Sequence, residues 1–293
     1  MLTVLEVVRK SAEFLAGKGI ESPRLNAELI VGHALGLARM QLYLQFERSL
    51  SEAEAGKIRS LVIRRGQREP LQHLIGSVEF FGLKLKVDRR ALIPRPETEF
   101  LVEMIVGRRA DSPPKSVLDL GTGTGAIALA LAGKWPEATV TAIDSREEAL
   151  ELARENAVST GLDSRVSFLK SDWFGSIAAD ARFELAIANP PYLSKAELAS
   201  SAVEVRDHEP AGALVSGEDG IGDIRAILRA APAHLAPGGL LALETGMDQH
   251  ALIRRIAEEY GWSGTESIRD LSGRDRYVLA WAGQPLPATV SGA

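Results

Sequence analysis

Residues 119–125 read Asp119-Leu120-Gly121-Thr122-Gly123-Thr124-Gly125, a glycine-rich loop that decides the fold class. The apolar pair Val117-Leu118 precedes the loop, and the helix-forming run 126–132 follows it. Glycines let the backbone turn sharply and approach a ligand closely, and a helix N-terminus adds a partial positive charge. The spacing is GxGxG and not the GxGxxG of dinucleotide-binding proteins. The stretch therefore predicts a strand, a ligand-binding turn and a helix.

Strands and helices alternate on both sides of this loop. β-rich runs occur at 116–120, 139–143, 166–170, 184–188 and 240–244, with helical segments between them. Such alternation predicts an α/β fold, a parallel sheet covered by helices on both faces. The last two β-rich runs, at 262–268 and 277–281, are joined by a loop too short for a helical crossover. These two strands must therefore pair antiparallel, which gives seven strands with an antiparallel last strand.

The chain divides into four predicted segments. Residues 1–75 read as helices only, with capping boxes at Thr3 and Ser51 and a cap followed by proline at Ser22-Pro23. Residues 76–97 read as a β-hairpin and a linker, and residues 98–283 carry the alternating pattern. Residues 284–293 are small, polar and proline-bearing, which predicts a flexible tail.

Composition excludes several kinds of site. The chain has 293 residues and no cysteine, so it holds no disulfide, thiolate nucleophile or Cys-bound metal, in keeping with a cytoplasmic location. Its five histidines lack metal-ligand spacing, and we expect no metal. No apolar run approaches the 18 or so residues of a membrane span. The net charge of −5 argues weakly against duplex nucleic acid as a partner.

Two acidic residues accompany the glycine loop. Asp119 precedes it, and Asp144 ends the next predicted strand, where its carboxylate could accept hydrogen bonds from two ribose hydroxyls. Together with GxGxG and the terminal antiparallel pair, this pattern resembles the class I S-adenosylmethionine-dependent methyltransferases. The resemblance implies their Rossmann-like sheet, here preceded by a small all-helical domain and a β-hairpin linker.

The resemblance also implies S-adenosylmethionine as the cofactor. The methionine moiety would pack on the glycine loop, that is on Gly121, Thr122, Gly123, Thr124 and Gly125. Asp144 would hold the ribose, and the loop that contains Asp172 and Trp173 would frame the adenine. Core packing accounts for Trp173 equally well. Asn189 completes the expected cofactor-binding set.

Asn189-Pro190-Pro191-Tyr192 follows the predicted strand 184–188, at the sheet edge where such folds bind ligands. An amide or aryl-amine nitrogen is a poor nucleophile because its lone pair is delocalised. The Asn189 side-chain oxygen and the Pro190 carbonyl can accept both of its N–H bonds, which orients the lone pair and shares the developing positive charge. The Tyr192 ring can stack on the planar group. We therefore expect Asn189, Pro190 and Tyr192 to be catalytic, and all four residues to bind substrate.

The rest of the chain narrows the substrate. The helical front, EPLQHLIG at 69–76, the hairpin, IPRPETE at 93–99, DLGTGTGAIALALA at 119–132 and the Asn-Pro-Pro-Tyr motif occur in this order. Together they resemble the PrmC/HemK family of release factor glutamine N5-methyltransferases. The resemblance implies methylation of the glutamine in the Gly-Gly-Gln motif of class 1 peptide chain release factors. It also implies that residues 1–75 dock the release factor.

Two other functions remain open on the residues alone. The same four-residue motif occurs in N6-adenine and N2-guanine methyltransferases that act on nucleic acid, although a basic recognition surface is not visible here. A non-catalytic scaffold, or an NAD-dependent oxidoreductase, would use a similar fold. We expect a monomer, a protein substrate, no membrane association and no direct nucleic-acid partner.

Overall fold

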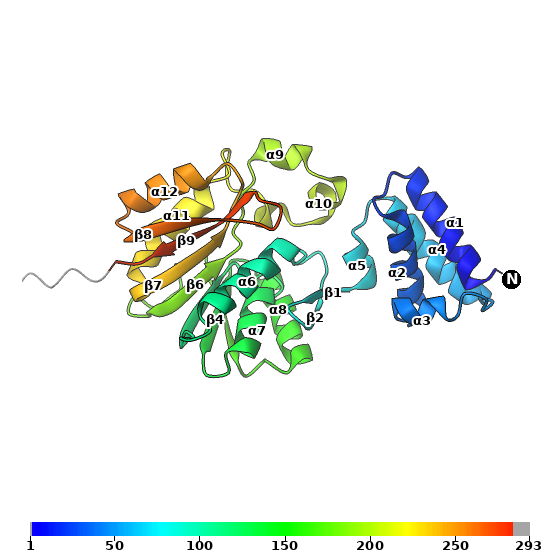
Figure 1. Ribbon diagram of the computed structural model, residues 1–293, viewed down its shortest axis with the longest axis horizontal. Helices are drawn as coiled ribbons and strands as arrows, with labels where there is room; N and C mark the ends of the chain where they lie inside the picture. Colours follow the sequence, from blue (N-terminus) through cyan, green and yellow to red (C-terminus); the bar gives the residue numbers. More distant parts are fainter. Residues whose placement is uncertain (1, 284–293) are drawn as a thin grey trace, which may run out of the picture. The chain divides into compact units, whose positions relative to one another are not determined.

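The computed structural model describes residues 2–283, which form two compact units (Figure 1). The first unit extends to Ser77 and also includes Ala202–His208. The second unit comprises Val78–Ser201 and the chain from Glu209 onward. No helix in residues 2–283 combines the length and apolar character needed to cross a membrane. The predicted tail, 284–293, lies outside the described residues.

The first unit is helical, as the sequence predicts. Its helices are α1 (Val4–Gly17), α2 (Pro23–Leu35), α3 (Arg39–Tyr43), α4 (Glu52–Gly66), α5 (Leu71–Ile75) and α10 (Val203–His208). Thr3 and Ser51 form the predicted capping boxes. The predicted positions are confirmed, with Ser22 as the N-cap and Pro23 as the first residue of α2, but Ser22 has a left-handed backbone (φ 47°) and its side chain makes no capping hydrogen bond. The Asn26 side chain donates to the Ser22 carbonyl.

Helix α10 comes from a distant part of the chain and is held by a buried arginine. Both Arg65 terminal nitrogens lie 3.1 Å from a Glu204 carboxylate oxygen, and Arg65 Nε donates to Asn26 Oδ1 at 2.8 Å. Arg65 is only 7% exposed, so this ion pair is largely shielded from water. The insertion 202–208 is therefore tied to the helical unit by a specific contact.

The second unit contains a two-stranded hairpin and a seven-stranded sheet. The hairpin strands are β1 (Ser77–Phe80) and β2 (Leu83–Lys86). The sheet strands are β3 (Ser116–Leu120), β4 (Thr139–Asp144), β5 (Val166–Lys170), β6 (Phe183–Ala188), β7 (Leu235–Glu244), β8 (Gly264–Arg269) and β9 (Asp275–Trp281). Their order is β5-β4-β3-β6-β7-β9-β8.

The predicted sheet topology is confirmed. The five strands from β3 to β7 are parallel, and β9 lies antiparallel between β7 and β8. Strand β7 begins five residues before the predicted run. Phe183 pairs with Leu235 ahead of a register shift, and this pairing extends the strand across Gly238-Gly239.

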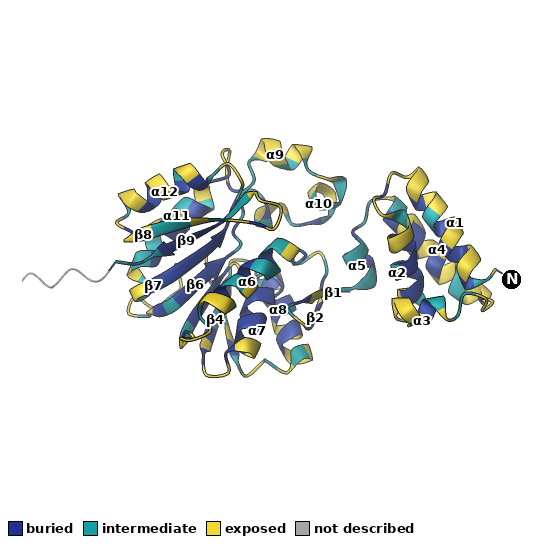
Figure 2. Cartoon of the chain, viewed as in Figure 1, coloured by how far each residue is buried: buried dark blue, intermediate teal, exposed yellow. Residues whose placement is uncertain are grey.

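Helices cover both faces of the sheet, and Figure 2 shows the strands as a buried layer between them. Helices α6 (Pro96–Arg108), α7 (Ala126–Lys134) and α8 (Glu147–Thr160) pack on one face. Helices α11 (Gly222–Ala230) and α12 (His250–Glu259) pack on the other. Because side chains alternate along a strand, Val117 enters the first core and Leu118 the second. The short helix α9 (Lys195–Ser200) buries no residue.

One buried side chain joins the hairpin to the glycine loop. Asn156 on α8 accepts a hydrogen bond from the Lys86 N–H at 2.7 Å and donates to the carbonyls of Lys86 and Thr124. It is fully buried and all its hydrogen-bonding groups have partners. The glycine loop is thus anchored from behind by an element far along the chain.

Candidate active site

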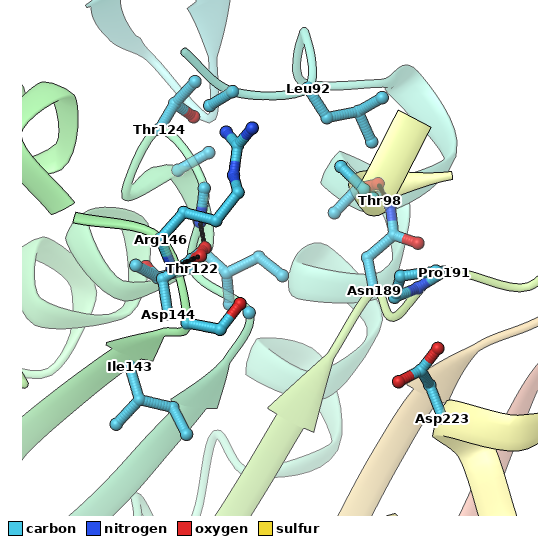
Figure 3. Close-up of a pocket in the computed structure, with 18 of the residues that line it drawn as sticks. Leu92, Thr98, Thr122, Thr124, Ile143, Asp144, Arg146, Asn189, Pro191 and Asp223 are labelled. Atoms are coloured by element: carbon cyan, nitrogen blue, oxygen red, sulfur yellow. Dashed lines mark hydrogen bonds between the residues drawn. The ribbon is translucent and has the colours of Figure 1, made fainter. Parts of the chain in front are cut away.

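An open cleft lies at the carboxyl ends of the parallel strands. The chain runs from β3 to β4 on one side and returns to β6 on the other, which makes this edge a topological switch point. Residues that follow successive strands meet there: Gly121 and Thr122 after β3, Asp144 at the end of β4, Asp172 and Trp173 after β5, and Asn189 after β6. In Figure 3, Thr122 and Asp144 face Thr98 and Asn189 across the cavity.

The glycine loop has the backbone that the sequence predicts. Gly121 and Gly125 have φ angles of +72° and +83°, a region that side chains with a Cβ rarely adopt. A Cβ on Gly125 would also lie 3.2 Å from the Ala153 Cβ. Residues 121–124 line the cleft, whereas Gly125 does not and instead is the N-cap of α7.

Asp119 organises this loop from below. Its Oδ2 accepts hydrogen bonds from the Thr122 hydroxyl at 2.6 Å and from the Ala128 N–H at 3.1 Å. The side chain is completely buried, and burial raises its pKa to about 7. Asp119 is absent from the cleft lining, so it fixes the loop to α7 and does not reach a ligand there.

Asp144 presents its carboxylate to the cleft in a fixed orientation. One oxygen accepts the Gly123 N–H and the other accepts the Arg146 N–H, both at 3.0 Å. Each oxygen keeps a second lone pair. A ligand with two neighbouring hydroxyls, such as a ribose, is the chemistry that these lone pairs fit.

The loop after β5 supplies an aromatic wall. Trp173 lines the cleft with a strained left-handed backbone (φ 45°), and its ring lies close to Gly121. Its Nε1 donates to an Asp223 carboxylate oxygen at 3.0 Å. The ring also packs against the second core, and the predicted contact of Trp173 with the adenine stays a prediction. Asp172 is exposed and lines the same wall.

The four residues of the Asn-Pro-Pro-Tyr motif do not all line the cleft. Asn189 and Pro191 line the cleft, but Pro190 and Tyr192 do not. Pro190 is buried, and its carbonyl accepts no hydrogen bond from residues 2–283. The Tyr192 hydroxyl donates to Glu244 at 3.3 Å, and the Arg276 guanidinium lies over its ring at 5.9 Å. The catalytic roles given to Pro190 and Tyr192 stay predictions.

The nitrogen end of the Asn189 side-chain amide is held by a hydrogen bond. Its Nδ2 donates to the Thr98 hydroxyl at 2.9 Å, and Thr98 donates in turn to Glu244 at 2.6 Å. Among the described residues no donor reaches Asn189 Oδ1, and Figure 3 shows this oxygen turned away from Thr98. A free acceptor of this kind can bind an N–H group.

The neighbouring proline-rich segment completes one wall. Arg95 and Thr98 line the cleft, and Glu97 does not. Arg95 pairs with the buried carboxylate of Glu209, which also accepts the Ile93 N–H at 3.1 Å. Glu209 therefore fixes the segment before α6.

Sequence reasoning missed several residues of the site. Arg146 and Asp223 line the cleft, and Glu244 lies behind it. Glu244 had a usable signal, because it ends a buried apolar strand at the same sheet edge as Asp144 and Asn189. Asp223 lies at the start of a helix, where an acidic residue is ordinary, and offered no such signal.

These residues fit S-adenosylmethionine. The glycine loop admits close backbone approach, Asp144 offers two acceptors for ribose hydroxyls, and Trp173 offers a wall for a planar base. An NAD-dependent reading lacks its fingerprint, since the loop has GxGxG spacing.

Family models match parts of both units. Residues 6–76 match the family described as PrmC N-terminal domain, and residues 96–217 match the methyltransferase small domain. The release factor glutamine methyltransferase of Rhodopirellula baltica is 39% identical over 281 residues, which cover 94% of this chain and 95% of that protein. The protein of the same name from Chlorobaculum tepidum is 40% identical over 290 residues, 96% of this chain and 97% of the other.

One solved structure is similar to this chain in its fold, and this similarity carries no conclusion about function. The 16S rRNA N2 methyltransferase RsmC of T. thermophilus, in complex with AdoMet and guanosine, has a TM-score of 0.52 at 20% identity. The match covers 70% of this chain and 49% of the RsmC chain. The seven-stranded sheet is thus that of the class I methyltransferases. The match to the methyltransferase small domain and the full-length relatives make S-adenosylmethionine the cofactor. Since the full-length relatives share both units at about 39% identity, the chain belongs to the release factor glutamine methyltransferase family.

Proposed function

We propose that this methyltransferase transfers a methyl group from S-adenosylmethionine to the side-chain N5 of the glutamine in the Gly-Gly-Gln motif of class 1 peptide chain release factors. The observation that carries the proposal is the state of Asn189. Its nitrogen is held by Thr98, its oxygen accepts no hydrogen bond from residues 2–283, and the residue lines the same cleft as the glycine loop. Family membership supports the release factor as substrate.

Asn189 and Pro190 orient the glutamine amide of the substrate. When bound, S-adenosylmethionine supplies an electrophilic methyl group on a positively charged sulfur. Asn189 Oδ1 and the Pro190 carbonyl accept the two N–H bonds of the glutamine amide, so the nitrogen is turned toward that methyl group. The new N–C bond forms as the C–S bond breaks, and the electron pair of that bond stays on sulfur.

The two acceptors also stabilise charge. Positive charge builds on the amide nitrogen during transfer, and oxygen acceptors at its hydrogens are stronger partners for that state than for the neutral amide. The nitrogen loses one proton to water after the methyl group has moved, so no general base is needed before attack.

The rest of the proposal concerns the docking of the substrate, the oligomeric state and the location of the enzyme. The helical residues 1–75 dock the release factor, the enzyme acts as a monomer in the cytoplasm where release factors work, and it needs no nucleic acid. The N6-adenine and N2-guanine alternatives gain no support from the full-length relatives.

The test is a site-mapping assay. We expect that release factor incubated with enzyme and labelled cofactor takes up one methyl group, which peptide mass spectrometry places on the Gly-Gly-Gln glutamine. A release factor with that glutamine changed to alanine serves as the matched control and takes up no label. Label on the control protein, or on added RNA in preference to the release factor, would reject the proposal.

A further inference from the structure

We propose that Glu244 and Thr98 are positioning residues, which determine which end of the Asn189 side-chain amide faces the substrate. An asparagine amide offers an oxygen acceptor at one end and an NH₂ donor at the other, and the two ends have nearly the same shape. Only the acceptor end suits an N–H substrate. This inference rests on the proposed function and names residues that the sequence motif does not contain.

Two consecutive hydrogen bonds connect strand β7 to the Asn-Pro-Pro-Tyr motif. Glu244 ends β7, Thr98 lies in the first turn of α6, and Asn189 follows β6. The Thr98 hydroxyl lies 2.6 Å from Glu244 Oε2 and 2.9 Å from Asn189 Nδ2. Thr98 and Glu244 are 5% and 1% exposed, so water has little access to either side chain.

The number of available protons fixes which group donates in each of these hydrogen bonds. A carboxylate can only accept hydrogen bonds, so the single hydroxyl proton of Thr98 is committed to Glu244. Toward Asn189 the Thr98 oxygen can then only accept a hydrogen bond. The Asn189 NH₂ group can donate to it, whereas the Asn189 carbonyl oxygen cannot. The negative charge of Glu244 thus leaves Asn189 Oδ1 free. A neutral, proton-donating group at position 244 would allow the opposite orientation.

Opposing influences act on the ionisation of the Glu244 carboxyl group. The titratable or charged groups that face it are Tyr192, Arg276, Tyr277 and Glu97. Burial raises the pKa of Glu244, while the Thr98 hydrogen bond, the Arg276 charge and the Tyr192 hydroxyl oppose this shift. The other carboxylate oxygen, Oε1, accepts from the Tyr192 hydroxyl, so both oxygens face hydroxyl donors.

Two substitutions at Thr98 separate positioning from packing. Thr98→Val keeps the shape and removes the hydroxyl, whereas Thr98→Ser keeps the hydroxyl and removes a methyl group. We expect kcat for release factor methylation to fall at least about tenfold in Thr98→Val and to stay within about threefold of wild type in Thr98→Ser. Affinity for S-adenosylhomocysteine should be unchanged in both. A purely structural role predicts the reverse order, and that order would overturn the inference.

Glu244→Gln tests the charge. Glutamine has the same shape but can donate as well as accept, so the donor in each hydrogen bond is no longer fixed. We expect kcat to fall at least about tenfold. Wild-type kcat should also decline at low pH as Glu244 takes up a proton, through a pKa above the usual value for glutamate, and this decline should vanish in Glu244→Gln. An unchanged kcat with the same acidic decline would reject the role of Glu244.

A measurement without release factor keeps this inference distinct from the proposed function. Neutron diffraction from deuterium-exchanged crystals of the full chain locates the deuterons directly. We expect two deuterons on the Asn189 atom nearest Thr98, and the Thr98 deuteron pointing to Glu244. The opposite arrangement contradicts the inference whatever the substrate. Conversely, wild-type enzyme that shows this arrangement and does not methylate release factor would contradict the proposed function alone.

Discussion

Asn189→Ala lowers kcat for release factor methylation about 10²- to 10³-fold and leaves affinity for S-adenosylhomocysteine within about threefold of wild type. The side-chain oxygen of Asn189 has no other partner in residues 2–283, so its contact with the substrate nitrogen is free to strengthen as charge builds. Removing a contact that acts mainly in the transition state lowers kcat more than it changes binding. Single-turnover rates with labelled cofactor, together with calorimetry, give the two quantities.

The split between rate and binding decides the outcome of this experiment. The unchanged cofactor affinity of Asn189→Ala is its own control for folding, because the glycine loop and Asp144 lie in the same unit. If turnover and cofactor affinity fall by the same factor, Asn189 holds the cofactor and does not orient the substrate. If neither changes, the assignment of this motif is wrong.

Asp144→Asn weakens S-adenosylhomocysteine binding about 100-fold. Both Asp144 oxygens accept backbone N–H groups, from Gly123 and Arg146. An asparagine must turn its NH₂ toward one of these donors, and it also loses the charge that strengthens hydrogen bonds from ribose hydroxyls. Isothermal titration calorimetry measures the change, and kcat at saturating cofactor should stay within a few-fold of wild type.

A matched substitution controls for the loss of one negative charge. Asp180 is exposed and takes part in none of the contacts of the cleft. Asp180→Asn should bind S-adenosylhomocysteine as wild type does. Equal affinities for Asp144→Asn and wild type would show that Asp144 does not hold the cofactor.

Local signals account for what could be predicted from the sequence. The glycine loop, the strand runs and the capping boxes at Thr3 and Ser51 depend on residues a few positions apart, and the structure confirms them. Ser22 precedes Pro23 at the predicted helix start, but residue type does not reveal that its backbone is left-handed and that its side chain makes no capping hydrogen bond.

Contacts between distant residues account for what could not be predicted. Thr98 and Glu244 are 146 positions apart, and Arg65 and Glu204 are 139 apart. No periodicity relates such pairs, so the support behind Asn189 and the placement of α10 became visible only in the fold. The motif itself was found from sequence, yet its division into cleft-lining and buried members was not, since four consecutive residues carry no sign of which side chains face inward.

The central claim is that a rigid turn presents two oxygen acceptors to a carboxamide nitrogen. A crystal structure of the full chain with S-adenosylhomocysteine and a Gly-Gly-Gln peptide tests it most directly. We expect the glutamine nitrogen to lie within hydrogen-bonding distance of Asn189 Oδ1 and the Pro190 carbonyl, and to face the sulfur. A peptide bound elsewhere, or a glutamine amide whose nitrogen contacts neither oxygen, would contradict it.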